Sequence, residues 1–70
     1  MKKTKPSHLA ATLRKLRCQA GLSQGDLAGR TGLSQGSISL METGRIVPRV
    51  VTLGRLARGL GVAGIEIPAG

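Results

Sequence analysis

The stretch GLSQGDLAGRTGLSQGSISLMETG, residues 21–44, decides how this chain folds. Its pattern of polar and apolar residues predicts two short helices, residues 24–31 and 35–41, joined by a tight turn. Gly32 stands at the turn, because glycine adopts a positive φ at little cost and can end the first helix. Helix, short turn with glycine, helix is the order of a helix-turn-helix.

Capping residues support both boundaries. Ser23 and Asp26 have the spacing of a capping box, in which serine accepts from the third amide and the acid accepts from the serine amide. Ser34 is placed to cap the second helix, in which Ile38 and Met41 lie three residues apart and face inward.

Composition limits the fold class. The chain has 70 residues and no Phe, Tyr or Trp, so its core must be built from aliphatic side chains. An aliphatic core of this size favours helices packed on helices. The prediction is a compact all-α domain of four helices, related to five-helix domains that have one helix more.

Two further helices flank the motif, at residues 7–20 and 50–58. Ser7 is the expected cap of the first, whereas Arg49 gives the second no capping side chain. Four glycines inside the predicted helices add a cost of about 1 kcal/mol each relative to alanine. We therefore expect folding to be supported by DNA or by self-association. The residues expected to be buried are Leu9, Leu13, Leu16 and Ala20, then Val50, Leu53, Leu56, Ala57 and Leu60; the glycines are Gly25, Gly29, Gly36 and Gly54.

Charge indicates the kind of partner. Lys and Arg number 11 against 3 acidic residues, a formal charge of +8, which predicts an acidic partner such as nucleic acid. RNA and single-strand readers stack bases on aromatic side chains, and this chain has none. Double-stranded DNA is therefore favoured.

The sequence gives little support to a disulfide, a metal site, an enzymatic activity or a membrane segment. Cys18 is the only cysteine, which excludes an internal disulfide and, with His8 alone, a zinc site. We expect Cys18 to be a small filler on the first helix and His8 to be exposed and idle. No nucleophile, base and acid stand at useful spacing, so the expectation is no enzyme, no cofactor and no metal. Without a long apolar run after the basic start, we also expect no membrane association and a cytoplasmic location.

The motifs together resemble the Cro and phage-repressor (Xre) family of DNA-binding domains. The likeness spans residues 13–62. Its elements are L-R-x-L-R (13–17), G-L-S-Q (21–24), L-A (27–28), G-L-S (32–34), S-I-S (37–39), E-x-G-R (42–45), Pro48 and L-x-x-L-A-x-x-L-G-V (53–62).

The resemblance implies a function for each half of the motif. It places helix 35–41 in the major groove of DNA and the start of helix 24–31 against the phosphate backbone. Gln24 is implied to bind a phosphate and to brace the recognition helix. Glutamine can pair with adenine and serine with several bases. The predicted base contacts are Gln35, Ser37 and Ser39, and the predicted phosphate contacts are Ser23, Gln24, Ser34, Arg45, Arg14 and Arg17.

The recognition helix has fewer polar and basic side chains than this helix has in many members of the family. Gly36 and Leu40 stand where polar or basic base readers are common, so Leu40 meets either a thymine methyl group or a protein partner. Glu42 is expected to have a structural role, as the partner of Arg17 or Arg30.

Three segments are predicted: a basic arm (1–6), the helix-turn-helix domain (7–62) and an apolar tail (63–70). The arm, with Lys2, Lys3 and Lys5, is expected to be disordered, either as a solvated tail or as a contact to the DNA backbone. Ile65 and Ile67 in the tail either cover the core or form part of a homodimer contact.

The sequence thus predicts a sequence-specific regulator of transcription, most simply a repressor, that binds double-stranded DNA as a dimer. The alternative is an antitoxin-like or accessory module whose main partner is another protein, bound through Leu40 or the tail. A basic membrane-surface peptide is disfavoured, because the positive charge is spread over several helices.

Overall fold

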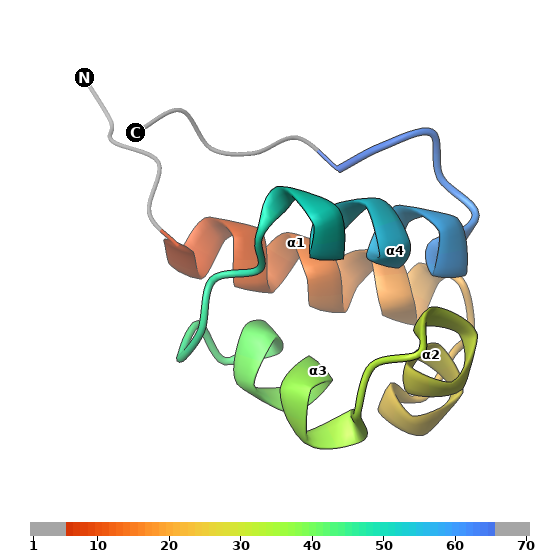
Figure 1. Ribbon diagram of the computed structural model, residues 1–70, viewed down its shortest axis with the longest axis horizontal. Helices are drawn as coiled ribbons and strands as arrows, with labels where there is room; N and C mark the ends of the chain where they lie inside the picture. Colours follow the sequence, from red (N-terminus) through yellow and green to blue (C-terminus); the bar gives the residue numbers. More distant parts are fainter. Residues whose placement is uncertain (1–5, 66–70) are drawn as a thin grey trace.

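Four helices make up the part of the chain that the computed structural model describes, residues 6–65 (Figure 1). No strand occurs within these residues, so the predicted all-α class is confirmed. Lys2, Lys3, Lys5 and Ile67 lie outside the described residues. The helices are α1 (Pro6–Gln19), α2 (Gln24–Thr31), α3 (Gln35–Glu42) and α4 (Val50–Leu60).

Each helix contributes one fully buried large side chain to a single core. These four residues are Leu13, Leu27, Ile38 and Leu56, each 1% exposed. In the view of Figure 1, α2 and α3 lie below α1 and α4, with this core between them. Ile65 packs against the core and is half-buried, which agrees with one of the two predictions for the tail.

The turn between α2 and α3 forms as the sequence predicts. Gly32 adopts a φ of 75° and its amide donates to the Ala28 carbonyl oxygen at 3.0 Å, which ends α2. Thr31 is buried, and its hydroxyl donates to the carbonyl oxygens of Leu27 and Ala28. These bonds fix the residue at which α2 ends and the turn begins.

The predicted helix ends need small corrections. Helix α1 already begins at Pro6, so Ser7 lies within it rather than capping it; proline is favoured at a first helical position because its missing N–H has no partner there. The same helix ends at Gln19, which leaves Ala20 exposed and outside it. Helices α3 and α4 extend to Glu42 and Leu60.

Val50 was expected in the core, and that prediction was wrong. The side chain is 70% exposed, and its neighbour Val51 is 74% exposed. The buried residues of α4 begin only at Leu53, so the first turn of α4 lies at the edge of the core. Arg49 gives that turn no side-chain cap, as predicted.

Gly59, which the sequence did not single out, is where α4 packs closely against α2. A Cβ at Gly59 would lie 2.7 Å from Thr31 Cγ2 and 3.2 Å from Leu27 Cδ1. The Thr31 side chain cannot turn away without breaking its hydroxyl bonds. The small residue therefore permits the contact between the two helices.

We expect opposite effects from two glycine substitutions. Gly59→Ala should lower the free energy of unfolding by about 1–3 kcal/mol, because the methyl group overpacks the α2–α4 contact. Gly29→Ala should raise it by about 0.5–1 kcal/mol, because nothing lies within 4 Å of an added Cβ there. Urea unfolding followed by circular dichroism measures both; equal effects would contradict this packing.

The capping box of α2 predicts a dependence on pH. Hydrogen bonds from the Ser23 amide and hydroxyl group lower the pKa of Asp26 below the usual 3.8. A lowered folded-state pKa means that the stabilisation is present above pH 3.8 and is lost as the pH falls through the folded-state pKa. Asp26→Asn should remove this part of the acid dependence, which unfolding curves between about pH 5 and pH 2 would reveal. An unchanged dependence in the variant would contradict the assignment.

Candidate nucleic-acid interface

The carboxylate of Glu42, the last residue of α3, joins α3 to α1. Arg17 Nε lies 2.6 Å from Glu42 Oε2, and Arg17 Nη2 donates to Glu42 Oε1 at 3.0 Å. The two side chains are only 13% and 4% exposed. This fork-shaped pair confirms the structural role predicted for Glu42 and selects Arg17 as its partner. The hydrogen bond to Glu42 also raises the pKa of Arg17 above the usual arginine value.

The same carboxylate connects α3 to α2. Gln24 Nε2, at the first position of α2, donates to Glu42 Oε1 at 3.2 Å, and Arg17 Nη1 donates to the Leu22 carbonyl oxygen at 2.8 Å. The Gln24 amide group has a second N–H that can still donate elsewhere. Three of the five N–H donors of Arg17 are engaged within the protein, so this side chain helps to position α3.

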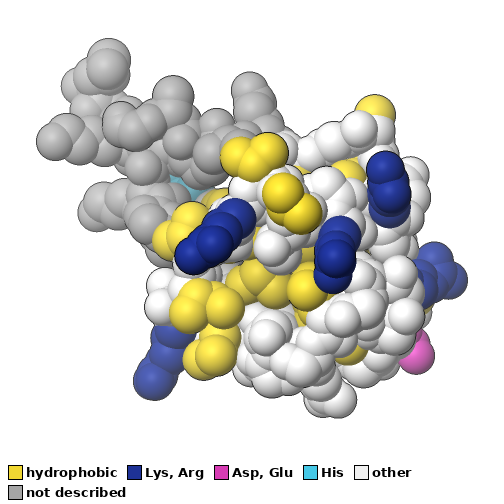
Figure 2. Space-filling view, in the orientation of Figure 1, with side chains coloured by type: hydrophobic (Ala, Val, Ile, Leu, Met, Phe, Trp, Pro, Cys, Tyr) yellow, Lys and Arg dark blue, Asp and Glu magenta, His cyan; other side chains and the backbone are white. Residues whose placement is uncertain are grey.

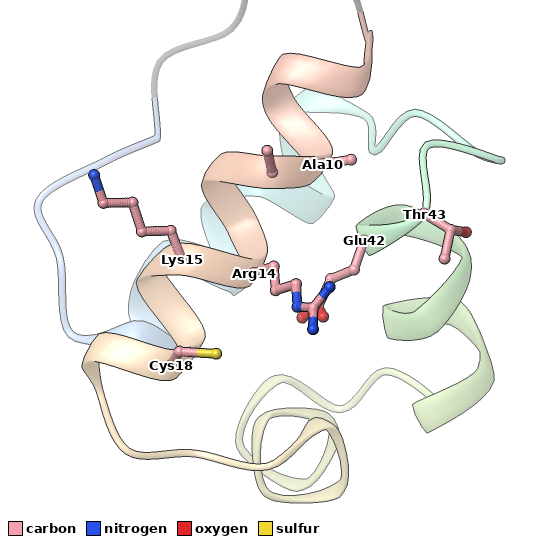
Figure 3. A pocket seen from close by; sticks show the side chains of 7 residues that line it. Ala10, Arg14, Lys15, Cys18, Glu42 and Thr43 are labelled. Atoms are coloured by element: carbon pink, nitrogen blue, oxygen red, sulfur yellow. The ribbon is translucent and has the colours of Figure 1, made fainter.

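A shallow pocket lies beside this network, between α1 and the end of α3. It has a volume of about 240 Å³. A second pocket along α1, of about 470 Å³, shares Arg14, Glu42 and Thr43 with it. Figure 3 shows Arg14 and Glu42 pointing into the space between α1 and α3, whereas Lys15 points away. Thr43, which the sequence analysis did not select, lines both pockets. Its only sequence signal is a polar residue directly after α3.

The first turn of α2 leaves amides open to solvent. Asp26 N donates to Ser23 Oγ and Ser23 N donates to Asp26 Oδ2, which confirms the capping box. Within the described residues, no hydrogen bond is formed by the amides of Gln24 and Gly25. Such amides, at the positive end of a helix, suit a phosphate oxygen.

The outer surface of α3 carries the predicted base readers. Gln35, Gly36 and Leu40 are exposed, whereas Ser37 and Ser39 are half-buried. Ser34 caps the helix by accepting from the Ser37 amide at 3.0 Å, and its hydroxyl donates to Ser37 Oγ at 2.9 Å. Among the residues of this surface, Gln35 has the longest polar side chain.

Arg45 follows α3 directly and extends the surface. Gly44 adopts a φ of 77°, and the Arg45 amide donates to the Leu40 carbonyl oxygen at 2.9 Å, so the chain turns sharply after α3. The Arg45 side chain is exposed. Arg30, the other possible partner of Glu42, instead donates to the Gly59 carbonyl oxygen at 3.4 Å.

Cys18 lies on the first helix, as expected, but it packs into no buried position. It is exposed, because the buried face of that helix is taken by Leu9, Ala10 and Leu13. His8 is exposed, as predicted. Within residues 6–65, no helix combines the length and apolarity needed to cross a bilayer.

A second exposed surface lies around α4 and the loop before it. Its apolar residues are Ile46, Val47, Val50 and Val51, which are 42–74% exposed. In Figure 2, apolar and basic side chains share this face, and acidic side chains show only at the edge of the view beside α2. We call these four residues the apolar face.

A model of the helix-turn-helix domain matches residues 8–69. The chain belongs to the helix-turn-helix domain family. An HTH-type transcriptional regulator of Sinorhizobium fredii is 43% identical over 53 residues, which cover 76% of this chain and 69% of the relative. Another, of Methanothermobacter thermautotrophicus, is 39% identical over 54 residues, covering 77% of this chain and 78% of the relative.

Solved structures agree with this membership. The restriction-modification controller protein C.AhdI of Aeromonas hydrophila is 32% identical with a TM-score of 0.79, over 81% of this chain and 86% of that chain. The clp gene regulator ClgR of C. glutamicum is 27% identical with a TM-score of 0.81, over 89% and 80% of the two chains. The predicted resemblance to the Xre family is therefore confirmed, and the family is one of DNA-binding transcriptional regulators rather than enzymes.

The hydrogen bonds of Glu42 predict that two arginines of α1 contribute unequally to the free energy of unfolding. Arg17→Met should lower the free energy of unfolding by about 2–3 kcal/mol, because Glu42 loses its charged partner while nearly buried. Arg14→Met is the matched control on the same helix and should change it by less than about 0.5 kcal/mol. Chemical unfolding measures both, and equal losses would contradict the network.

Proposed function

We propose that this helix-turn-helix protein is a sequence-specific regulator of transcription that binds double-stranded DNA as a homodimer. Helix α3 enters the major groove, and α2 lies across the backbone. The observation that carries the proposal is the braced motif: Glu42 ties α1, α2 and α3 together while the outer side of α3 stays exposed. A rigid reading helix beside open amides and arginines suits a duplex.

Contacts to bases come from α3. Gln35, at its first turn, reaches furthest and is the main reader, with Ser37 and Ser39 as secondary contacts. Phosphate contacts come from the ends of α2 and α3 and from arginines. These are Ser23, Gln24, Ser34, Arg14 and Arg45. Arg17 supports the surface from below through Glu42, and its two remaining N–H donors can contact a phosphate.

A dimer would place two copies of α3 in successive major grooves on one side of the duplex. Its operator would then be two-fold symmetric, with half-sites about 34–36 Å apart. The simplest mode of action is repression by occupying a promoter, in the bacterial nucleoid or in the host cytoplasm if a phage encodes the protein.

The proposal predicts the outcome of selection from a random duplex pool. The purified chain should recover a two-fold motif with half-sites about 10 base pairs apart, and its affinity should fall steeply with salt. Binding without any motif would contradict sequence-specific regulation, even if the affinity were high.

Two substitutions should separate reading from anchoring. Gln35→Ala should weaken preference at one base position by about 1–3 kcal/mol, because it removes a base contact. Arg45→Ala should weaken binding to all duplexes alike and reduce the salt slope by about 1, because it removes a phosphate contact. Titrations of specific and random duplexes at two salt concentrations measure both effects. If the two variants behave identically, the assignment of α3 as reader is wrong.

A second candidate function is that of an antitoxin-like or accessory module for another protein. The exposed Leu40 and the apolar face favour it, because contiguous apolar surface often marks a protein contact. Val50→Ser with Val51→Ser should then abolish co-purification of the partner and leave DNA affinity unchanged. Loss of DNA affinity in this variant would instead assign the face to the DNA complex.

A further inference from the structure

The side chain of Gln35 lies against the first turn of α2, at Gly25. A Cβ added to Gly25 would stand 3.3 Å from Gln35 Oε1 and 4.0 Å from Gln35 Cδ. A contact of 3.3 Å is tighter than most contacts of a real Cβ, so a methyl group at Gly25 would require the Gln35 carboxamide to shift by a few tenths of an ångström. The Gln35 carboxamide thus lies close to the first turn of α2.

Other exposed glycines within the helices differ from Gly25 in this respect. At Gly29 and Gly54 nothing lies within 4 Å of an added Cβ, and at Gly36 the nearest atom is Ser34 Oγ at 4.0 Å. A glycine inside a helix destabilises it relative to alanine. At Gly25 the missing side chain also leaves room for the Gln35 carboxamide beside α2. We call this position of the carboxamide the seat.

We propose that Gly25 is a specificity-determining positioning residue, whose bare backbone seats the Gln35 carboxamide and fixes the edge that Gln35 presents to a base. The inference rests on the proposed function, in which Gln35 reads a base pair. A long glutamine side chain that is already restricted loses less conformational freedom when it binds.

Orientation matters as much as restriction. The two ends of a carboxamide are different, since the oxygen accepts and the nitrogen donates. Of the Gln35 atoms, Oε1 lies closest to where a Cβ at Gly25 would stand, at the positive end of α2, where an oxygen is favoured over an amino group. The seat therefore disfavours a flip of the carboxamide. A flip would exchange donor and acceptor and would reduce discrimination between bases.

The test uses the intact protein and the duplex recovered by selection, together with single-pair variants of that duplex. Gln35→Ala first identifies the base pair that Gln35 reads. Gly25→Ala should then lower discrimination at that pair about three- to tenfold while preferences at the other positions remain. Gly29→Ala, on the same helix and without a neighbour at its Cβ, is the matched control and should keep every preference. A merely structural effect would weaken binding to all duplexes equally.

A double substitution and a spectroscopic measurement complete the test. Adding Gly25→Ala to Gln35→Ala should change discrimination no further, because the seat acts only through Gln35. In the free protein, nuclear Overhauser effects between the Gln35 side-chain protons and Gly25 Hα should be present. They should weaken in Gly25→Ala, where they are measured to the protons of the substituted alanine.

Three results would overturn the inference. Gly25→Ala could keep full discrimination at the Gln35 pair, or it could bind the duplex more tightly, which would mean that the seat withholds Gln35 from DNA. Either result would leave the proposed function intact. Unchanged base preference in Gln35→Ala would instead overturn both the reader assignment and the seat.

Discussion

The Glu42 carboxylate is the interaction on which the arrangement of this molecule depends. It accepts hydrogen bonds from Arg17 on α1 and Gln24 on α2, while itself closing α3. Helices α1, α2 and α3 are thereby joined at one nearly buried point. An ion pair in such a place is costly to break, because either partner alone would be left with a desolvated charge. The direction of α3 is set by this point at one end and by the Gly32 turn at the other.

The distribution of charge follows from how the acidic groups are used. Among residues 6–65, Asp26 and Glu42 are the acidic residues, and each is engaged within the fold. Asp26 closes the capping box of α2, and Glu42 binds Arg17. Within residues 6–65, Glu42 is nearly buried and Asp26 is the exposed acidic residue, so the exposed charge of this part is mostly basic, a distribution that favours association with a polyanion. The bonds that engage Asp26 and Glu42 within the fold therefore also favour the attraction of DNA to the basic surface.

Local signals in the sequence predicted the motif well, because caps and turns act over a few residues. Ser23 with Asp26, Ser34 and Gly32 fixed the bounds of α2 and the start of α3. For Glu42, local sequence predicts a partner among the arginines, Arg17 or Arg30. Choosing between them required the tertiary structure, since Arg17 and Arg30 lie on different helices. Helical periodicity alone placed Val50 in the core, yet burial of α4 begins at Leu53. Gly59 and the contact between Gly25 and Gln35 carry no local signal, because their role arises only when two helices meet.

We propose that the braced outer side of α3 reads duplex DNA, and a crystal structure of the chain bound to a duplex recovered by selection would decide this. We expect α3 in the major groove with the Gln35 carboxamide on a base edge. We also expect the first-turn amides of α2 on a phosphate and an unbroken pair between Arg17 and Glu42. If the duplex instead lies against α4 and the apolar face, with α3 turned to solvent, α3 is not the reader.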